Sequence, residues 1–462
     1  MSGSLAIVGG GIVGLAHAWS AAERGWRVTV FERHGRSQGA TVRNFGMVWP
    51  IGQPAGRALE VAKVSRARWL QFARESGFRV DTCGSIHLAH RPDEWEVLQQ
   101  FAVVAPGMGY ECELLVREAT LARAPGANQH GLLGGLFSPM ELGVDPNRAA
   151  ADLAAWLTER RGVTIRWNTL VGAVSAGPKV HFGGHAESFD RVCICSGSDF
   201  AELFPQAFAG AGLRNCKLQM LETVPQAGGW RIGPHLASGL TLRHYANFQV
   251  CPGLVGLARR IREETPELDR YGIHVMASQP EDGRVILGDS HEYGDEITPF
   301  DQAVIEELML RELRKVFHLP DWTIRRRWEW HLRQIPGRVW FPCGSVAGGV
   351  GQHRHRRVGH DHVVRHRRRI LERGTMSQPR TPILGLLLDW AGTTVDHGSR
   401  APARVFEEVF RRSGVPVTEA EARGPMGMAK RAHIAAVLNL PRVARVWEDR
   451  HGRPPTDGDV QR

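Results

Sequence analysis

Three glycines close to the start of the chain are the first residues that suggest chemistry. Gly9, Gly11 and Gly14 follow the apolar run Leu5–Val8, and a helical pattern begins directly after them. In a turn from strand to helix, the first glycine permits the sharp turn, the second lets the backbone approach a pyrophosphate, and the third lets helix and strand pack closely. The helix N-terminus then offers backbone amides to the phosphates. This spacing predicts a dinucleotide site.

Glu32 supports the same interpretation. It ends a second predicted strand, Val28–Phe31, which follows the helical stretch Leu15–Arg24, and it lies 18 residues after Gly14. A carboxylate at that position can accept hydrogen bonds from ribose hydroxyls. Bound FAD and bound NAD both fit these residues, and a purely structural glycine turn is the alternative.

Two further segments favour FAD. The loop Arg33–Met47 follows Glu32, and the predicted strand Val192–Cys195 ends in Ser196–Gly197. Both resemble flavin-contacting segments of the D-amino-acid oxidase, glycine oxidase and sarcosine oxidase family, and the resemblance covers residues 1 to about 341. It implies an FAD site at Gly9, Gly11, Ile12, Val13, Gly14, Glu32, Arg33, Arg43, Asn44, Phe45, Gly46, Ser196 and Gly197.

The resemblance also implies a reaction. In this family the flavin takes a hydride from the carbon that bears an amine, the imine hydrolyses, and oxygen usually reoxidises the flavin, so no general base is strictly required. Arg43–Pro54 and Gly288–Gly294 resemble a subgroup encoded beside phosphonate-degradation genes. The expected substrate is a small anionic amine, 2-aminoethylphosphonate or an N-methyl derivative, with oxygen or another electron acceptor as the second partner. A D-amino-acid or glycine-type oxidase is the alternative.

An anionic substrate needs a cationic contact, for which the planar guanidinium of arginine is well suited. By family position, the candidates for substrate binding are Arg243, His244, Tyr245, His274 and His291. Taken singly, each could equally be a solvated arginine or a hydrogen-bonded histidine of the core.

A strongly basic tract interrupts the chain after this region. Residues 342–375 lose hydrophobic periodicity, and His353–Arg369 holds seven Arg and five His against one Asp, a formal +6 of the chain's +10. A metal site would need ligands held in fixed geometry, and a nucleic-acid site would be expected to interleave aromatic residues. The tract has no periodicity that would hold metal ligands in place, and it has no interleaved aromatic residues. It therefore fits neither kind of site, and no nucleic-acid partner is expected.

The codon table offers another explanation of this tract. If His353–Arg357 is encoded CAC CGG CAC CGG CGG, a shift of one base gives Thr-Gly-Thr-Gly-Gly, and continuing to Arg367 gives Trp-Gly-Met-Thr-Met-Ser-Phe-Gly-Ile-Ala. Only the third bases are free choices. The shifted product resembles the family's C-terminal segment, which begins the helix that faces the flavin. The sequence therefore suggests a frameshift-like junction that replaces this segment.

A different enzyme pattern begins at Met376. The predicted strand Ile383–Leu388 leads into Asp389, with Ala391 two positions later. This segment, 376–462, resembles the start of phosphonoacetaldehyde hydrolase in the haloacid dehalogenase superfamily. The resemblance implies Asp389 as nucleophile and possible Mg²⁺ ligand, and Lys430, in a predicted helix Lys430–Leu438, as the Schiff-base lysine. The later motifs that complete the sheet and the Mg²⁺ site are missing, and hydrolase activity from this segment is a second candidate function.

Composition sets the broad class. The chain has 462 residues, 42% hydrophobic, and outside the basic tract it is close to neutral. Its seven cysteines show no repeated CxxC spacing, and no apolar run reaches the ~18 residues that span a bilayer. We therefore expect a cytoplasmic α/β protein with no membrane partner. Residues 1–341 should form a Rossmann-type FAD domain (about 1–55, 145–200 and 325–341) with an inserted antiparallel substrate domain, followed by the junction 342–375 and an incomplete Rossmannoid fragment with a helical cap.

Overall fold

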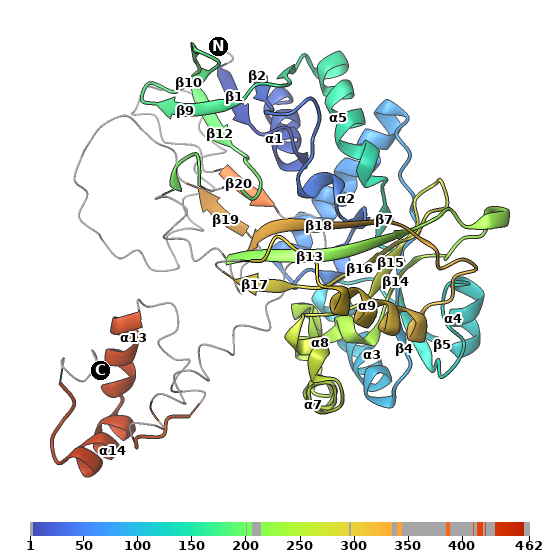
Figure 1. Ribbon diagram of the computed structural model, residues 1–462, viewed down its shortest axis with the longest axis vertical. Helices are drawn as coiled ribbons and strands as arrows, with labels where there is room; N and C mark the ends of the chain where they lie inside the picture. Colours follow the sequence, from blue (N-terminus) through green and yellow to red (C-terminus); the bar gives the residue numbers. More distant parts are fainter. Residues whose placement is uncertain are drawn as a thin grey trace.

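A parallel sheet with strand order β12-β1-β2-β8 forms the upper part of the molecule in Figure 1. The computed structural model describes residues 3–199, 201–205, 214–294, 297–334, 340–343, 385–388, 410, 414–418, 421 and 430–456. The neighbours of β1 lie on opposite sides of it, so the carboxyl ends of these strands meet at a topological switch point, where such sheets bind ligands. The strands are β1 (Ser4–Val8), β2 (Arg27–Phe31), β8 (Thr164–Arg166) and β12 (Arg191–Ile194).

Alternation along β1 explains how this sheet is covered. Leu5 and Ile7 pack with the helices α1 (Ile12–Ala22) and α5 (Pro146–Arg161). Ala6 and Val8 point to the other face, where they pack with residues of a three-stranded antiparallel sheet. Since successive side chains of a strand alternate between faces, the apolar run Leu5–Val8 of β1 is suited to burial on both sides. The covering sheet consists of β9 (Val171–Ser175), β10 (Lys179–Phe182) and β11 (His185–Ser188).

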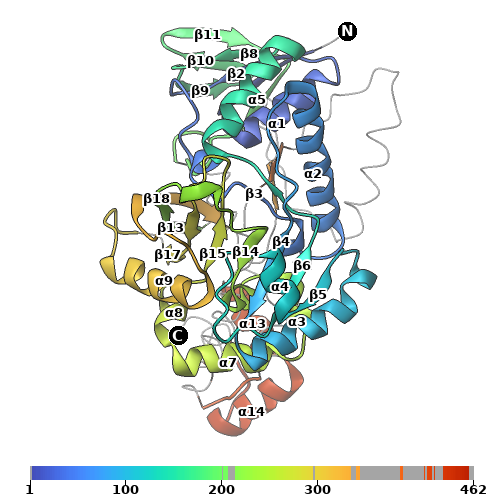
Figure 2. The same ribbon diagram turned by 90° about the vertical axis from the view of Figure 1, so that its right-hand side faces the viewer.

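A second, nine-stranded sheet forms the lower lobe, and α3, α7, α8 and α9 lie against it in both views (Figures 1 and 2). Its order is β17-β13-β16-β15-β14-β4-β6-β5, and β18 pairs with the other edge of β13. Its strands pair in antiparallel fashion except for β14 with β4. The strands are β4 (Ser85–Ala89), β5 (Glu113–Val116), β6 (Gly134–Ser138), β13 (Arg214–Thr223), β14 (His235–Ala237), β15 (Met276–Ser278), β16 (Ile286–Gly288), β17 (Glu292–Gly294) and β18 (Ile324–Gln334).

Helices bury the largest hydrophobic core of the described residues against this sheet. In α9, for example, Ile305, Met309 and Leu313 recur at helical spacing and are buried, as expected for an amphipathic surface helix. The helices are α3 (Pro92–Val104), α4 (Arg117–Arg123), α7 (Leu254–Glu264), α8 (Pro266–Arg270) and α9 (Ala303–Val316), with short 3₁₀ turns that include η5 (Gly239–Arg243) and η6 (Ala246–Val250).

The chain crosses between the two sheets through a connecting segment and a long helix. The segment holds η1 (Ala40–Val42), β3 (Met47–Val48) and η2 (Pro50–Gly52), and β3 pairs with β7 (Leu142–Gly143). It leads into α2 (Arg57–Ser76), which runs alongside both lobes in Figure 2. The architecture confirms the predicted α/β fold, a Rossmann-type domain with an inserted, mainly antiparallel domain.

β18 lies in the substrate-domain sheet. The sequence placed it among the cofactor-binding parts, about 325–341, whereas the structure pairs it with β13 over most of its length. The buried Lys217 of β13 fixes this edge, since its Nζ lies 2.7 Å from Glu329 Oε2 and 3.0 Å from Asp301 Oδ1. β18 therefore reaches the cofactor loop from the substrate side.

The C-terminal part contributes a few described elements. β19 (Trp340–Cys343) pairs with β20 (Gly385–Leu388), which overlaps the strand predicted before Asp389. The helix α13 (Lys430–Leu438) has the predicted bounds, and it is followed by α14 (Pro441–His451). A small core that includes Val437 and Trp447 joins these two helices.

Among the described residues, no helix combines the length and the apolar character needed to cross a membrane.

Candidate active site

The glycine turn connects the carboxyl ends of three strands. The Gly9 amide donates to the carbonyl of Phe31 at 2.8 Å, and the Cys195 amide donates to the carbonyl of Val8 at 2.7 Å. Gly9 has φ +112°, and a Cβ there would lie 2.0 Å from the Cys195 oxygen. A Cβ on Gly14 would lie 1.9 Å from the Gly9 oxygen. The turn is therefore closed to any side chain at these two positions.

Gly11 is different from the other two glycines. It is the N-cap of α1 and has no side chain with which to cap the helix, and a Cβ there would meet only the Thr41 hydroxyl, at 3.1 Å. Open space at a helix N-terminus is what a pyrophosphate requires. The turn thus fits the phosphates of a dinucleotide, with Gly11, Ile12 and Val13 as the backbone nearest to them.

Glu32 stands at the end of β2, as expected, and is buried at 8% exposure. One carboxylate oxygen accepts from the Gly10 amide at 2.8 Å, and the other accepts from the His34 amide at 3.0 Å. The oxygen that accepts from the His34 amide also lies 3.2 Å from His34 Nδ1, whereas the oxygen that accepts from the Gly10 amide keeps a second lone pair that could accept from a ribose hydroxyl.

Two hydroxyl residues of this turn were not anticipated from the sequence. Ser37 Oγ donates to the Gly10 carbonyl at 2.6 Å, and Thr41 Oγ1 accepts from the Ile12 amide at 3.0 Å. Both follow Glu32 in the chain, Ser37 in the loop before η1 and Thr41 within η1. Their signal in the sequence is weak, because serine and threonine are common in any loop and only the fold reveals their partners.

Arg33 links the ends of β2 and β12. Its guanidinium lies 2.6 Å from Asp199 and 3.7 Å from Glu202, and the hydrogen bond to Asp199 raises the pKa of Arg33. Ser196 Oγ donates to the Asp199 carbonyl at 2.6 Å, and Gly197 has φ +68°. The predicted cofactor residues at the ends of these two strands therefore lie close together.

The loop Arg43–Gly46 joins the two domains. Arg43 Nη1 donates to the Glu329 carbonyl at 3.1 Å, and Trp328 Nε1 donates to the Arg43 carbonyl at 3.0 Å. The Asn44 side chain holds the loop from within, since its Oδ1 accepts from the Gly46 amide at 2.7 Å. The buried Phe45 presents its carbonyl to the Ser278 hydroxyl at 2.6 Å. The loop is thus fixed from β18 and from β15.

Three of the predicted substrate residues form one cluster in the second domain. His244, His274 and His291 each offer a ring nitrogen within 4.8 Å of the other two. The rings of His244 and His274 are 3.9 Å apart, and those of His274 and His291 are 4.9 Å apart and stacked. Burial lowers the pKa of His291 to about 4 and that of His274 well below its usual value. These two imidazoles are therefore neutral near pH 7.

A buried acid completes the cluster. Asp289 Oδ1 lies 3.2 Å from His274 Nε2, and burial raises the pKa of Asp289 well above its usual value. A carboxyl group that stays protonated does not repel an anion and can donate a hydrogen bond. Asp289 was not among the candidates selected from the sequence, although it stands two residues before His291.

Arg243 and Tyr245 have other partners. Arg243 is buried and pairs with Asp269, and its Nη2 also donates to the Ile273 carbonyl at 3.3 Å. The Tyr245 hydroxyl donates to Met276 Sδ at 3.2 Å, and its ring lies 6.2 Å from that of Trp49. Arg243 thus holds the backbone beside the cluster through Asp269 and Ile273. Tyr245 connects the cluster to the segment that carries the cofactor loop.

The hydrolase-like residues remain predictions. Asp389 lies outside the described residues, and Lys430 is the first residue of α13. The pairing of Asp389 with Lys430, and a Mg²⁺ site at Asp389, are therefore not observed.

A dinucleotide turn at a switch point, with a mainly antiparallel domain over it, defines a two-domain dinucleotide-dependent oxidoreductase. Residues 4–350 match the family described as FAD dependent oxidoreductase (DAO), and the chain belongs to this family. The match ends three residues before His353, where the basic tract begins.

Solved structures agree at the level of the fold. The chain is similar to glycine oxidase from Bacillus cereus ATCC 14579, with a TM-score of 0.57 and 16% identity over 72% of this chain and 83% of that one. For glycine oxidase from Geobacillus kaustophilus the TM-score is 0.55, with 18% identity over 72% and 84%. For an FAD-bound L-α-glycerophosphate oxidase from Mycoplasma pneumoniae the TM-score is 0.54, with 18% identity over 72% of this chain and 83% of that one.

A short segment matches a different enzyme. Over 78 residues the chain is 56% identical to phosphonoacetaldehyde hydrolase from Paraburkholderia xenovorans, which is 17% of this chain and 29% of the relative. The corresponding enzyme of Paraburkholderia phytofirmans is 54% identical over the same length. The chain thus spans about three-tenths of the length of these curated relatives.

Proposed function

We propose that this chain derives from an FAD-dependent amine oxidoreductase whose substrate is a small aminophosphonate, either 2-aminoethylphosphonate or its N-methyl derivative. The observation that carries the proposal is the buried cluster of His244, His274 and His291, next to the buried Asp289, whose pKa is raised by burial. FAD, when bound at the glycine turn, would accept the hydride from the amine-bearing carbon.

The cluster suits an anion with several oxygens. Histidine nitrogens and a protonated carboxyl can donate hydrogen bonds to phosphonate oxygens, and such bonds strengthen when the imidazole is charged. Because His274 and His291 are neutral near pH 7 before an anion binds, an entering anion would bind together with a proton. Arg243 is already paired with Asp269, so we assign the anion contact to the histidines and give Arg243 a supporting role.

The position of the cluster supports its link to the cofactor site. Tyr245 contacts both Trp49, in the segment after the cofactor loop, and the ring of His244, at 5.3 Å. A Cβ on Gly288, the residue before Asp289, would lie 3.5 Å from the Phe45 ring. The loop that holds Phe45 resembles a flavin-contacting segment of the family. An amine held between the histidines and this loop would therefore lie beside the expected position of the flavin.

The hydrolase-like segment supports the phosphonate assignment chemically. Oxidation of 2-aminoethylphosphonate, followed by imine hydrolysis, yields phosphonoacetaldehyde, which is the substrate in the name of the matched hydrolase. Two joined activities that share this intermediate would form consecutive steps. Hydrolysis by Asp389 and Lys430 is the second candidate function, and it predicts phosphate release from phosphonoacetaldehyde.

We further propose that residues 353–367 replace the family's flavin-facing segment through a shift of one base. The shifted product begins just beyond residue 350, where the family match ends. We call the chain that carries the shifted fifteen residues the restored chain. It retains every residue of the glycine turn and the histidine cluster.

The substrate assignment predicts a selectivity and a pH dependence. With excess FAD and a dye acceptor, the restored chain should show a kcat/KM at least about 10-fold higher for 2-aminoethylphosphonate or its N-methyl form than for glycine or D-alanine. KM for the phosphonate should fall as the pH is lowered from about 8 to 6. The reason is that the anion would bind together with a proton, whereas His291, with a pKa of about 4 before the anion binds, is neutral in this pH range. Replacing His274 by glutamine should remove much of the selectivity. Preference for glycine, or a KM that does not change with pH, would contradict the assignment.

A further inference from the structure

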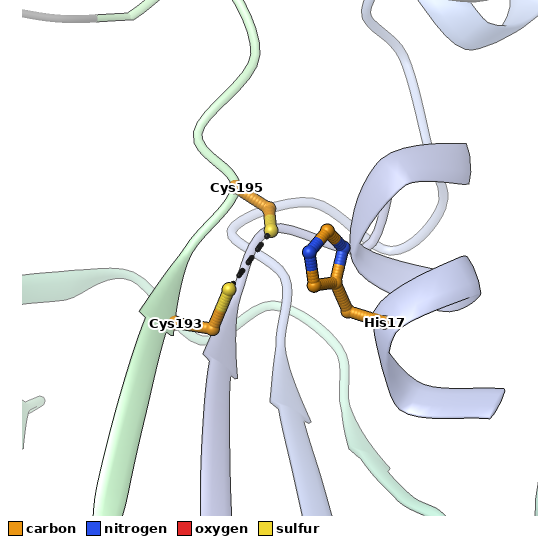
Figure 3. Close-up of side chains that lie close together, drawn as sticks. All are labelled: His17, Cys193 and Cys195. Atoms are coloured by element: carbon orange, nitrogen blue, oxygen red, sulfur yellow. Dashed lines mark hydrogen bonds between the residues drawn. The ribbon is translucent and has the colours of Figure 1, made fainter. Parts of the chain in front are cut away.

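A second side-chain cluster lies outside the proposed substrate site. Cys193 and Cys195 stand two positions apart at the end of β12, so their side chains share one face of the strand. His17 faces them from α1 (Figure 3). One ligand atom from each of the three residues lies within 4.8 Å of the other two.

The distance between the sulfur atoms suits a metal better than a disulfide. Cys193 Sγ and Cys195 Sγ are 3.6 Å apart. A disulfide would need about 2.05 Å, whereas two thiolates on a tetrahedral zinc at about 2.3 Å each are separated by about 3.8 Å. One ring nitrogen of His17 lies within 4.8 Å of both sulfur atoms, so a small movement of the imidazole would bring it to the third position.

His17 is oriented as a metal ligand. Its Nδ1 lies 2.8 Å from the Val13 carbonyl, so this nitrogen carries the proton and donates it. Nε2 then keeps its lone pair, and Figure 3 shows this edge of the ring turned toward the sulfur atoms. Histidines that bind metals typically donate their other N–H to a carbonyl or carboxylate in this way, which fixes the tautomer.

We propose that His17 Nε2, Cys193 Sγ and Cys195 Sγ bind a zinc ion, with water in the fourth position. Two thiolates and an imidazole are the donor set that zinc prefers, and binding would release the two thiol protons to solvent. Neither the amine oxidation nor the dinucleotide turn uses these three side chains.

A metal here would tie α1 to β12 beside the glycine turn. The backbone of Cys195 is in contact with Gly9, and His17 lies little more than one helical turn after Ile12. Because the ion would bind the folded chain and not the unfolded one, it should raise the melting temperature. The ion would therefore stabilise the end of the sheet that faces the dinucleotide.

Cobalt provides the test, because a thiolate–Co²⁺ bond gives a charge-transfer absorption that histidine-only sites lack. The full-length chain, freed of metal by a chelator and reduced, should bind one equivalent of Co²⁺ with this absorption, and Zn²⁺ should displace it. Cys193→Ser and His17→Gln should each weaken binding at least about 10-fold. Cys112→Ser, a partly buried cysteine elsewhere, should leave binding unchanged.

The result that would overturn the proposal is equally specific. A cobalt–thiolate absorption that persists with unchanged affinity in Cys193→Ser would place the metal at other cysteines of the chain. A Cys193–Cys195 disulfide in the unreduced chain would show that the pair is a redox couple instead. If the variants misfold, alkylation of the unmodified chain decides, because Zn²⁺ must then protect Cys193 and Cys195 from iodoacetamide.

Discussion

Replacing Gly14 by alanine is expected to weaken FAD binding severely. The new Cβ would lie 1.9 Å from the Gly9 carbonyl oxygen, and that atom belongs to the backbone and cannot swing away. Helix α1 would have to move off β1, which would displace the amides that face the pyrophosphate. We expect FAD affinity to fall at least about 100-fold, or about 3 kcal/mol, measured by titration and flavin fluorescence.

A second glycine gives the matched control for this experiment. Gly172 lies on β9 at an exposed position and has an ordinary backbone conformation, and a Cβ added to it would meet no atom within 4 Å. Gly172→Ala should bind FAD like the unchanged chain. FAD affinity that is unaffected in Gly14→Ala would show that the cofactor binds elsewhere.

The restored chain is expected to bind FAD at least about 100-fold more tightly than the chain with residues 353–367 as they stand. In the family that the shifted sequence resembles, this segment begins the helix whose N-terminus faces the flavin. Two or three hydrogen bonds from such amides, at about 1 kcal/mol each and with the helix dipole added, account for a change of this size. Purified FAD content and affinity measure it.

The control for the restored chain is a variant with the same fifteen shifted residues in scrambled order. It should bind FAD no better than the chain as it stands, because composition alone does not build a helix start beside the flavin. Equal FAD content in all three chains would contradict the proposed frame shift, and so would full flavin content and amine oxidation by the unmodified chain.

The glycine turn was predictable from the sequence because its determinants are local. Gly9, Gly11, Gly14 and Glu32 lie within one strand-helix-strand unit, so their spacing alone predicted the turn that the structure shows. Thr41 and Ser37 form hydrogen bonds to the same turn from the loop that follows Glu32, and no sequence pattern predicted these contacts. The position of β18 was also hidden, since it depends on pairing with β13 roughly a hundred residues earlier in the chain.

The histidine cluster was predictable only as a set of candidate residues. His244, His274 and His291 come from three separate segments, and only the fold brings their rings within 5 Å of one another. The sequence could not show that Arg243 is paired with Asp269, which lies 26 residues away. It likewise gave no reason to select Asp289, which the fold buries beside His274.

Anaerobic reduction of the flavin tests the central claim most directly. The restored chain, loaded with FAD and kept free of oxygen, is mixed with 2-aminoethylphosphonate or its N-methyl derivative, and the visible flavin absorption is followed. We predict that this absorption is lost without any added acceptor and that phosphonoacetaldehyde forms in equal amount. A bound flavin that stays oxidised with both aminophosphonates, while glycine or D-alanine reduces it, would contradict the proposed function.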